Sequence, residues 1–237
     1  MLWLTDTLAR WPWASLAVPA SPAWLAAPAL LGAGVAVWRL PVLLQALALL
    51  LALPVLWPAV RQPAPGEWWL RALDIGQGSA ALVRTRHHLL LYDAGPAQAP
   101  GEDAGERVIW PSLRALGERQ IDELLLSHGD LDHIGGAASL LRRLPVGRIR
   151  HSLEPNHPVL AGPSAALPCQ AGQAWTWDGV RFEVLWPPEP GARRQGRTNA
   201  ASCVLRVCRR AGWHRPSGRA VRPGWRRVSA HSRRCSR

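Results

Sequence analysis

The stretch Ser127–Gly136, SHGDLDHIGG, places four potential metal ligands within six residues. They are His128, Asp130, Asp132 and His133. A segment typical of a buried strand, Ile121–Leu126, comes directly before the stretch, and a helix-like run follows its two closing glycines. A loop between a strand and a helix can turn all four side chains toward one point. The stretch therefore predicts a metal site at the end of a buried strand.

The spacing of the four residues divides them into two pairs. His128 and Asp130 are two residues apart and share one side of an extended loop, whereas Asp132 and His133 are adjacent and point differently. Two neighbouring metal ions, one held by each pair, could bind a bridging hydroxide. Neutral histidine suits zinc, and added carboxylates move the preference toward manganese or magnesium. The structural alternative is that Asp132 or His133 caps a helix beginning near Ile134.

Strands and helices of mixed order are expected around this stretch, which suits a layered α/β sandwich. The expected strands are Trp68–Asp74, Ala80–Thr85, His88–Tyr92, Ile121–Leu126, Arg148–His151, Gln173–Trp177, Val180–Trp186 and Asn199–Val207, and the expected helices are Arg107–Leu116 and Ala137–Leu144. Asp178-Gly179 is a strong hairpin signal between two of these strands.

The first 62 residues form a membrane-type hydrophobic segment by composition. Ala23–Val37 and Val42–Trp57 are apolar apart from Gln45, but each run is shorter than the roughly 20 residues of a straight spanning helix. Two short helices in a membrane hairpin, one long kinked span and a buried soluble helical pair all remain open. A linker rich in proline and glycine follows, and a domain of different texture covers 66–207.

The net charge of +12 comes from the end of the chain. All 16 acidic residues lie before Pro190, whereas 14 of the 28 arginines lie after Glu189. The basicity is therefore no signature of nucleic-acid binding by the whole chain. We interpret 208–237 as an aberrant, frameshifted or disordered arginine-rich tail, with a nucleic-acid-binding arm as the alternative. The four cysteines form no CxxC pair, and they indicate neither a disulfide nor a compartment.

The metal-ligand stretch resembles the motif of the metallo-β-lactamase superfamily, with Asp130 where most members have histidine. Together with LDIGQGSA at Leu73–Ala80 and YDAG at Tyr92–Gly95, it resembles the C-terminal domain of ComEC-type DNA-internalisation competence proteins, over roughly Trp69–Val207. The resemblance implies an αββα sandwich, incomplete here, preceded by hydrophobic membrane helices. The family's next motif, a Gly-Asp after a strand, is missing after Val207, so we expect weak metal binding.

The resemblance also implies roles for individual residues. His128 and Asp130 would bind one ion, and Asp132 and His133 would bind or face the second, with zinc or manganese as the metal. Asp132 would orient the attacking water as the catalytic residue, and Asp93 would position the metal loop. Gly76, Gln77 and Gly78 would lie near the substrate phosphate. Ordinary turns at Gly76–Gly78 and at Asp93–Gly95 remain the alternatives.

The implied function is metal-dependent phosphodiester hydrolysis of DNA during uptake. The implied substrate is single-stranded DNA, and the implied partners are the membrane and components of the DNA-uptake machinery. The implied location is the inner membrane, with several spans and the hydrolase domain on its outer face. One alternative is a non-catalytic module that guides single-stranded DNA. Another is a superfamily hydrolase acting on lactams, thioesters or small phosphodiesters.

Overall fold

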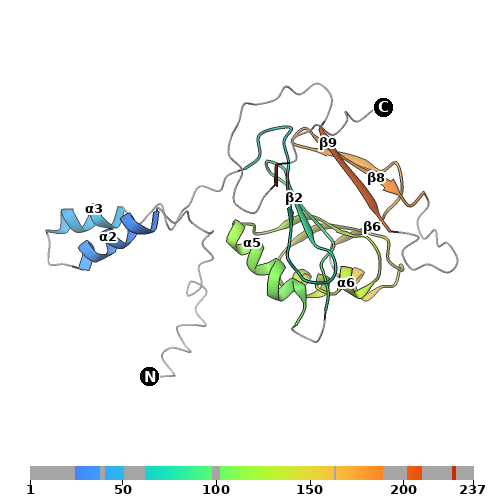
Figure 1. Ribbon diagram of the computed structural model, residues 1–237, viewed down its shortest axis with the longest axis horizontal. Coiled ribbons are helices and arrows are strands. Elements are labelled where there is room, and N and C mark those ends of the chain that lie inside the picture. Colours follow the sequence, from blue (N-terminus) through green and yellow to red (C-terminus); the bar gives the residue numbers. More distant parts are fainter. Residues whose placement is uncertain are drawn as a thin grey trace. The chain divides into compact units, whose positions relative to one another are not determined.

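The structure is a computed structural model that describes residues 25–37, 41–50, 62–97, 102–162, 164–188, 202–209 and 226–227. The chain divides into two compact units (Figure 1). One is Met1–Val60 with Ser112–Glu118, and the other is Arg61–Pro111 with Arg119–Arg237.

Two apolar helices, α2 (Ala26–Val37) and α3 (Val42–Leu50), lie in the expected hydrophobic segment and pack against each other. Their surfaces leave large apolar side chains in the open, with Leu30 73% and Val42 81% exposed. Within the described residues, no helix combines the length and the apolar character that crossing a membrane requires. The membrane character of this segment therefore stays a prediction.

The larger sheet has seven strands in the order β10-β1-β2-β3-β4-β5-β6. Its strands in chain order are β1 (Trp69–Ala72), β2 (Ala81–Arg84), β3 (Leu89–Tyr92), β4 (Ile121–Leu126), β5 (Val146–His151), β6 (Ala165–Pro168) and β10 (Arg226–Arg227). β1 to β3 form an antiparallel meander, and β3 to β6 are parallel. The carboxyl ends of four neighbouring strands thus meet at one edge, where side chains that follow the strands can converge.

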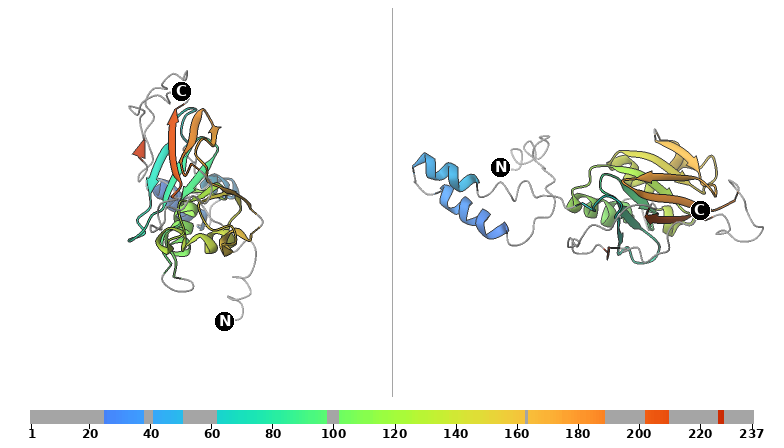
Figure 2. Two further views of the ribbon diagram at one scale, coloured as in Figure 1. Left: turned by 90° about the vertical axis from the view of Figure 1, so that its right-hand side faces the viewer. Right: turned by 90° about the horizontal axis from the view of Figure 1, so that it is seen from above.

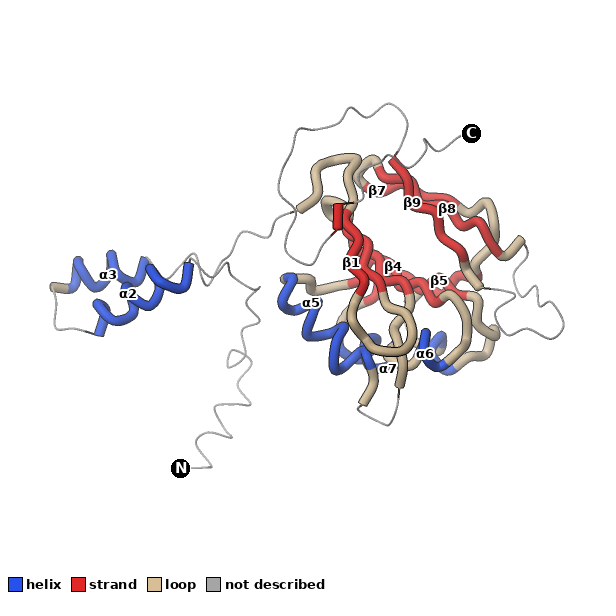
Figure 3. The backbone as a smooth tube through the Cα atoms, viewed as in Figure 1, coloured by secondary structure: helices blue, strands red, loops and turns tan. Residues whose placement is uncertain are grey.

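The smaller sheet is the antiparallel set β7 (Ala174–Trp177), β8 (Val180–Trp186) and β9 (Val204–Arg209). The predicted hairpin joins β7 to β8. Asp178 and Gly179 both have positive φ, 49° and 82°, as a tight two-residue hairpin turn requires. Figures 2 and 3 show this sheet stacked on one face of the larger sheet.

The core of the sandwich lies between the two sheets. Leu90 and Leu125 of the larger sheet contribute to it, together with Phe182 and Val184 of β8. Because side chains alternate along a strand, the buried Leu89, Leu91, Leu124 and Leu126 point to the opposite face. The helices α6 (Leu131–Ile134) and α7 (Ala137–Arg143) lie on that face (Figure 3). A π-helical turn (Gly105–Ile109) leads into α5 (Trp110–Leu116), and a 3₁₀ turn spans Pro158–Leu160.

Most predicted elements are present with shifted ends, and three points need correction. No strand was expected at β6, and a helix beginning near Ile134 was only an alternative, whereas α6 begins at Leu131. β9 spans Val204–Arg209, so the strand predicted over Asn199–Val207 begins later and ends two residues later than expected. β10 lies in the segment interpreted as an aberrant tail, yet it pairs with β1 and adds a strand at that edge of the larger sheet. The rest of 208–237 lies outside the described residues. In the described part the layers are helix, sheet and sheet, as an incomplete αββα sandwich predicts.

Candidate metal centre

The predicted metal loop follows β4 at the edge where the parallel strands end. Asp130 occupies the position before α6 and its side chain makes no capping hydrogen bond. Asp132 and His133 lie inside α6, because this helix begins at Leu131 rather than near Ile134. The prediction that one of them merely caps a helix is therefore wrong.

All four predicted ligands lie together, in the two pairs that their spacing predicted. His128 Nε2 lies 3.4 Å from Asp130 Oδ2, and His133 Nε2 lies 3.7 Å from Asp132 Oδ2. The two imidazole rings connect the pairs, with centroids 3.9 Å apart. The carboxylates are about 40% exposed, whereas the His128 side chain is only 8% exposed. The loop thus presents open carboxylates beside one nearly buried imidazole, His128, and one partly buried imidazole, His133.

The buried Asp93 anchors this loop through hydrogen bonds. Its carboxylate accepts hydrogen bonds from the Ser127 N–H at 2.7 Å and from Ser127 Oγ at 2.9 Å, and it lies 2.8 Å from His133 Nδ1. Burial raises the pKa of Asp93, and the hydrogen bonds from His133 and Ser127 oppose that rise. These contacts are the ones that a residue positioning the metal loop would make.

The same contacts determine which nitrogen of each histidine carries the proton. His133 Nδ1 donates to the Asp93 carboxylate, so in the neutral ring its Nε2 keeps a lone pair. Ser127 gives its one hydroxyl proton to Asp93, so its oxygen can only accept from His128 Nδ1, 2.9 Å away. In the neutral rings both Nε2 atoms, which face the carboxylates, are therefore left with a lone pair that a metal ion can take. Metal-binding histidines are commonly oriented in this way.

The loop Gly76-Gln77-Gly78 packs against the backbone of α6. Gly78 has a φ of 112°, and a Cβ there would overlap the carbonyl oxygen of Asp132. The next N–H, that of Ser79, donates to this same carbonyl at 3.2 Å. The loop therefore lies beside the candidate centre. The predicted contact between this loop and a substrate phosphate stays a prediction.

The donors fit metal ions in kind and in pairing, though not in number. No group of three or more histidine, cysteine, aspartate or glutamate side chains gathers around one point in the described part of the chain. Each pair offers two protein ligands, whereas zinc sites take at least three or share a bridging carboxylate. The sequence has no aspartate or glutamate after Glu189 that could bridge them.

Two features of the site were not predicted. Ser127 belongs to the hydrogen-bonded cluster, and its place beside His128 at the end of a strand was a signal that could have identified it. A disulfide joins Cys169 to Cys203, 34 residues further along the chain, and no spacing pattern in the sequence pointed to it.

The family model described as "Metallo-beta-lactamase superfamily" matches residues 73–201, which is more than half of the chain. This match includes strands β2 to β8 and the four predicted ligands. The chain belongs to the metallo-β-lactamase superfamily. Members of this superfamily bind metal ions, usually zinc.

Similarity to individual proteins assigns the chain to a narrower group within this superfamily. The chain is 35% identical to "Uncharacterized protein YcaI" of Escherichia coli over 83% of this chain and 22% of that protein. It is 43% identical to "Competence protein ComA" of Neisseria gonorrhoeae over 56% of this chain and 17% of that protein. It is 33% identical to "Recombination protein 2" of Haemophilus influenzae over 62% and 18%, respectively. The resemblance to ComEC-type competence proteins is confirmed, and the chain spans about a fifth of the length of these relatives.

Proposed function

We propose that this domain hydrolyses phosphodiester bonds of single-stranded DNA with the help of bound metal ions during DNA uptake. The observation that carries the proposal is the shared orientation of His128 and His133. Both Nδ1 atoms are bound from within the protein, and both Nε2 atoms face an open carboxylate. The names of the relatives supply the context of DNA uptake.

Each residue of the site has a distinct task in this proposal. His128 with Asp130 and His133 with Asp132 would hold two ions, zinc or manganese, and such ions lower the pKa of bound water and stabilise charge on phosphate oxygens. Asp132 is partly exposed and lies beside His133 Nε2, so it can orient the attacking water. Asp93 and Ser127 keep the histidines in the tautomer that leaves Nε2 available. Gly76, Gln77 and Gly78 provide backbone N–H groups for a phosphate.

The proposed location is the outer face of the inner membrane, with the apolar N-terminal segment in or at the membrane and the DNA-uptake machinery as partner. Exposed leucines on α2 and α3 support contact with an apolar environment. The disulfide between Cys169 and Cys203 supports an oxidising compartment, because disulfides are rare in the cytosol.

A second candidate is a module that guides single-stranded DNA without cleaving it. The observation that favours it is the set of two ligands for each ion, which predicts weak metal binding. A third possibility, another hydrolase of the superfamily, becomes an outcome of the test below.

The test combines metal content with cleavage of a labelled oligonucleotide by the wild type and Asp132→Ala. We expect slow cleavage that needs zinc or manganese and is lost in Asp132→Ala, with the circular dichroism spectrum unchanged. DNA binding without metal or cleavage would favour the guiding module. Turnover of a lactam or thioester without turnover of DNA would reject the proposed substrate.

A further inference from the structure

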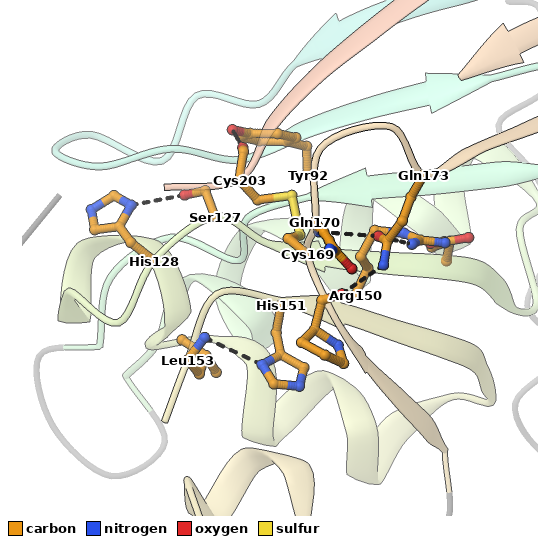
Figure 4. The surroundings of a disulfide bond; sticks show 12 residues. Tyr92, Ser127, His128, Arg150, His151, Leu153, Cys169, Gln170, Gln173 and Cys203 are labelled. Atoms are coloured by element: carbon orange, nitrogen blue, oxygen red, sulfur yellow. Dashed lines mark hydrogen bonds and ion pairs between the residues drawn. A yellow bond between two sulfur atoms is a disulfide. The ribbon is translucent and has the colours of Figure 1, made fainter. Parts of the chain in front are cut away.

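Cys203 contacts the two strands that end at the candidate metal centre (Figure 4). Its N–H donates to the Ser127 carbonyl at 2.8 Å, and its carbonyl accepts from the Tyr92 hydroxyl at 2.7 Å. Ser127 precedes the first ligand, His128, and Tyr92 precedes Asp93. The backbone of one residue next to β9 therefore contacts both segments that carry the site.

The other half-cystine, Cys169, lies on a well-fixed part of the larger sheet. Its N–H donates to the His151 carbonyl at 2.7 Å, at the end of β5. On either side of it, Gln173 bonds the Pro168 carbonyl at 3.0 Å and the Gln170 N–H at 3.2 Å. Gln173 is itself held by Arg150 at 2.6 Å. Cys169 can therefore hold Cys203 in place through the disulfide.

Both cysteines are buried in a small cluster with Leu125 and Val184, between the two sheets. Cys169 is 1% exposed and Cys203 is fully buried. The sulfur–sulfur bond thus links the end of β6 in the larger sheet to the start of β9 in the smaller sheet, directly behind the metal loop.

We propose that the Cys169–Cys203 disulfide is a positioning element of the metal centre. It keeps Cys203 where its backbone N–H and carbonyl fix Ser127 and Tyr92, and thereby sets the tautomer and direction of His128. Breaking the disulfide loosens this backbone and lowers the affinity of the loop for metal ions. The metal-affinity part rests on the proposed function, whereas the positioning of His128 can be measured without any metal.

Reduction of the disulfide requires only a reductant and water. A water-soluble trialkylphosphine reduces the bond to two thiols, each sulfur gains a proton, and the phosphine takes an oxygen atom from water to become its oxide. Such a reagent avoids the strong zinc chelation of dithiols.

The pairing is tested first, by mass spectrometry of a tryptic digest made without reduction. Cleavage after arginine leaves Cys169 in His151–Arg181, Cys203 in Thr198–Arg206 and Cys208 in a separate peptide. The expected product is the first peptide crosslinked to the second. A crosslink between Cys203 and Cys208, or free thiols at Cys169 and Cys203 in protein purified from an oxidising compartment, would overturn the proposal.

The positioning is tested by the nitrogen-15 spectra of the histidine side chains in the metal-free full chain at fixed pH. We expect His128 to carry its proton on Nδ1 in the wild type. We expect it to exchange between tautomers in the double variant Cys169→Ser/Cys203→Ser and in phosphine-treated wild type. His133, which Asp93 holds directly, should change less. An unchanged His128 in both reduced forms would refute the positioning role.

Asp178→Asn is the matched control, because Asp178 joins the sheets through Thr85, His87 and His88 away from the metal loop. It should lower the thermal midpoint without altering the His128 tautomer. Zinc affinity, measured by competition with a chromophoric chelator, should fall about 10-fold or more in the double variant and stay constant in Asp178→Asn. If zinc affinity fell equally in the double variant and in Asp178→Asn, the disulfide would only stabilise the fold in general, and the positioning role would be rejected. If no form binds zinc, the proposed function fails, while the histidine spectra still decide the positioning.

Discussion

Two clusters of histidine and aspartate occur in the same domain and are built in opposite ways. The metal loop contains His128, Asp130, Asp132 and His133. The hairpin cluster consists of Thr85, His87 and His88 around Asp178 at the β7–β8 turn. In the metal loop the Nδ1 atoms are bound from within, by Asp93 directly or through Ser127. In the hairpin cluster the carboxylate of a single aspartate, Asp178, is hydrogen-bonded to Nδ1 of both histidines, at 2.8 and 3.2 Å.

The difference separates a candidate site from a structural junction. In the metal loop the Asp130 side chain makes no capping hydrogen bond within the described residues, and both carboxylates that face Nε2 are open to solvent, so a cation can enter between them and the imidazoles. In the hairpin cluster the carboxylate is only 11% exposed and is saturated by hydrogen bonds. His88 also stacks on Trp177, with ring centroids 4.9 Å apart. The hairpin cluster therefore joins the two sheets.

The largest effect is expected for Asp93→Ala. This change leaves the Ser127 N–H, the Ser127 hydroxyl and His133 Nδ1 without their buried acceptor, and each such loss costs about 1–3 kcal/mol. We expect the free energy of unfolding to fall by about 3–5 kcal/mol, measured by urea denaturation.

Asp93→Asn sharpens the same comparison. Asparagine tolerates the positive φ of 58° at this position and still accepts from the Ser127 N–H, so the loss of stability should be smaller. Its amide would donate to His133 Nδ1 and move the proton to Nε2, so metal affinity should still fall by about 10- to 100-fold. An unchanged metal affinity in Asp93→Asn would contradict the assigned tautomer.

The next largest loss of stability is expected in the loop Gly76-Gln77-Gly78, which packs against α6. In Gly78→Ala the new Cβ meets the Asp132 carbonyl, a backbone atom that cannot move aside, and a side chain also strains the φ of 112°. We expect a loss of about 2–4 kcal/mol, against about 1 kcal/mol for Gly76→Ala, which has a positive φ but open space around it. Equal losses from the two variants would show that the loop does not pack against α6.

Sequence reasoning reached the metal loop because its signal is local. The four ligands and the strand before them lie within thirteen consecutive residues, and their spacing alone predicted both pairs. The turn that closes the third strand, Asp93–Gly95, was also recognisable from neighbouring residues. Asp93 does contact the metal loop, through Ser127 and His133. The functional roles of these residues, and the contact of Gly76–Gly78 with phosphate, stay predictions.

Contacts between distant segments could not be read in the same way. Cys169 and Cys203 approach each other only because β6 ends beside the start of β9. His87 and His88 showed no ligand spacing, and their partner Asp178 is 90 or more residues away. β6 is a short and mostly exposed strand, so it has no apolar pattern for the sequence to show.

The smallest effect is expected at the hairpin cluster, and it depends on pH. Burial alone would raise the pKa of Asp178, but the hydrogen bonds from the His87 N–H, from Thr85 and from both histidine rings outweigh it and hold the pKa well below its ordinary value of 3.8. A lowered pKa in the folded state means that the ionised carboxylate stabilises the fold. This stabilisation is fully present above the unfolded value, near pH 4, and is lost as the pH falls toward the lower folded value.

Asp178→Asn removes that stabilisation at neutral pH while keeping the size of the side chain. We expect a loss of about 1–2 kcal/mol at pH 7, measured by urea denaturation, since hydrogen bonds to a charged group contribute more than neutral ones. The difference between wild type and variant should stay constant from pH 7 to about pH 5 and shrink below about pH 4. Metal affinity at pH 7 should not change, because no member of the hairpin cluster contacts Asp93 or Ser127 through a hydrogen bond in the described residues. A variant that lost metal affinity as well as stability would show that the two clusters act as one.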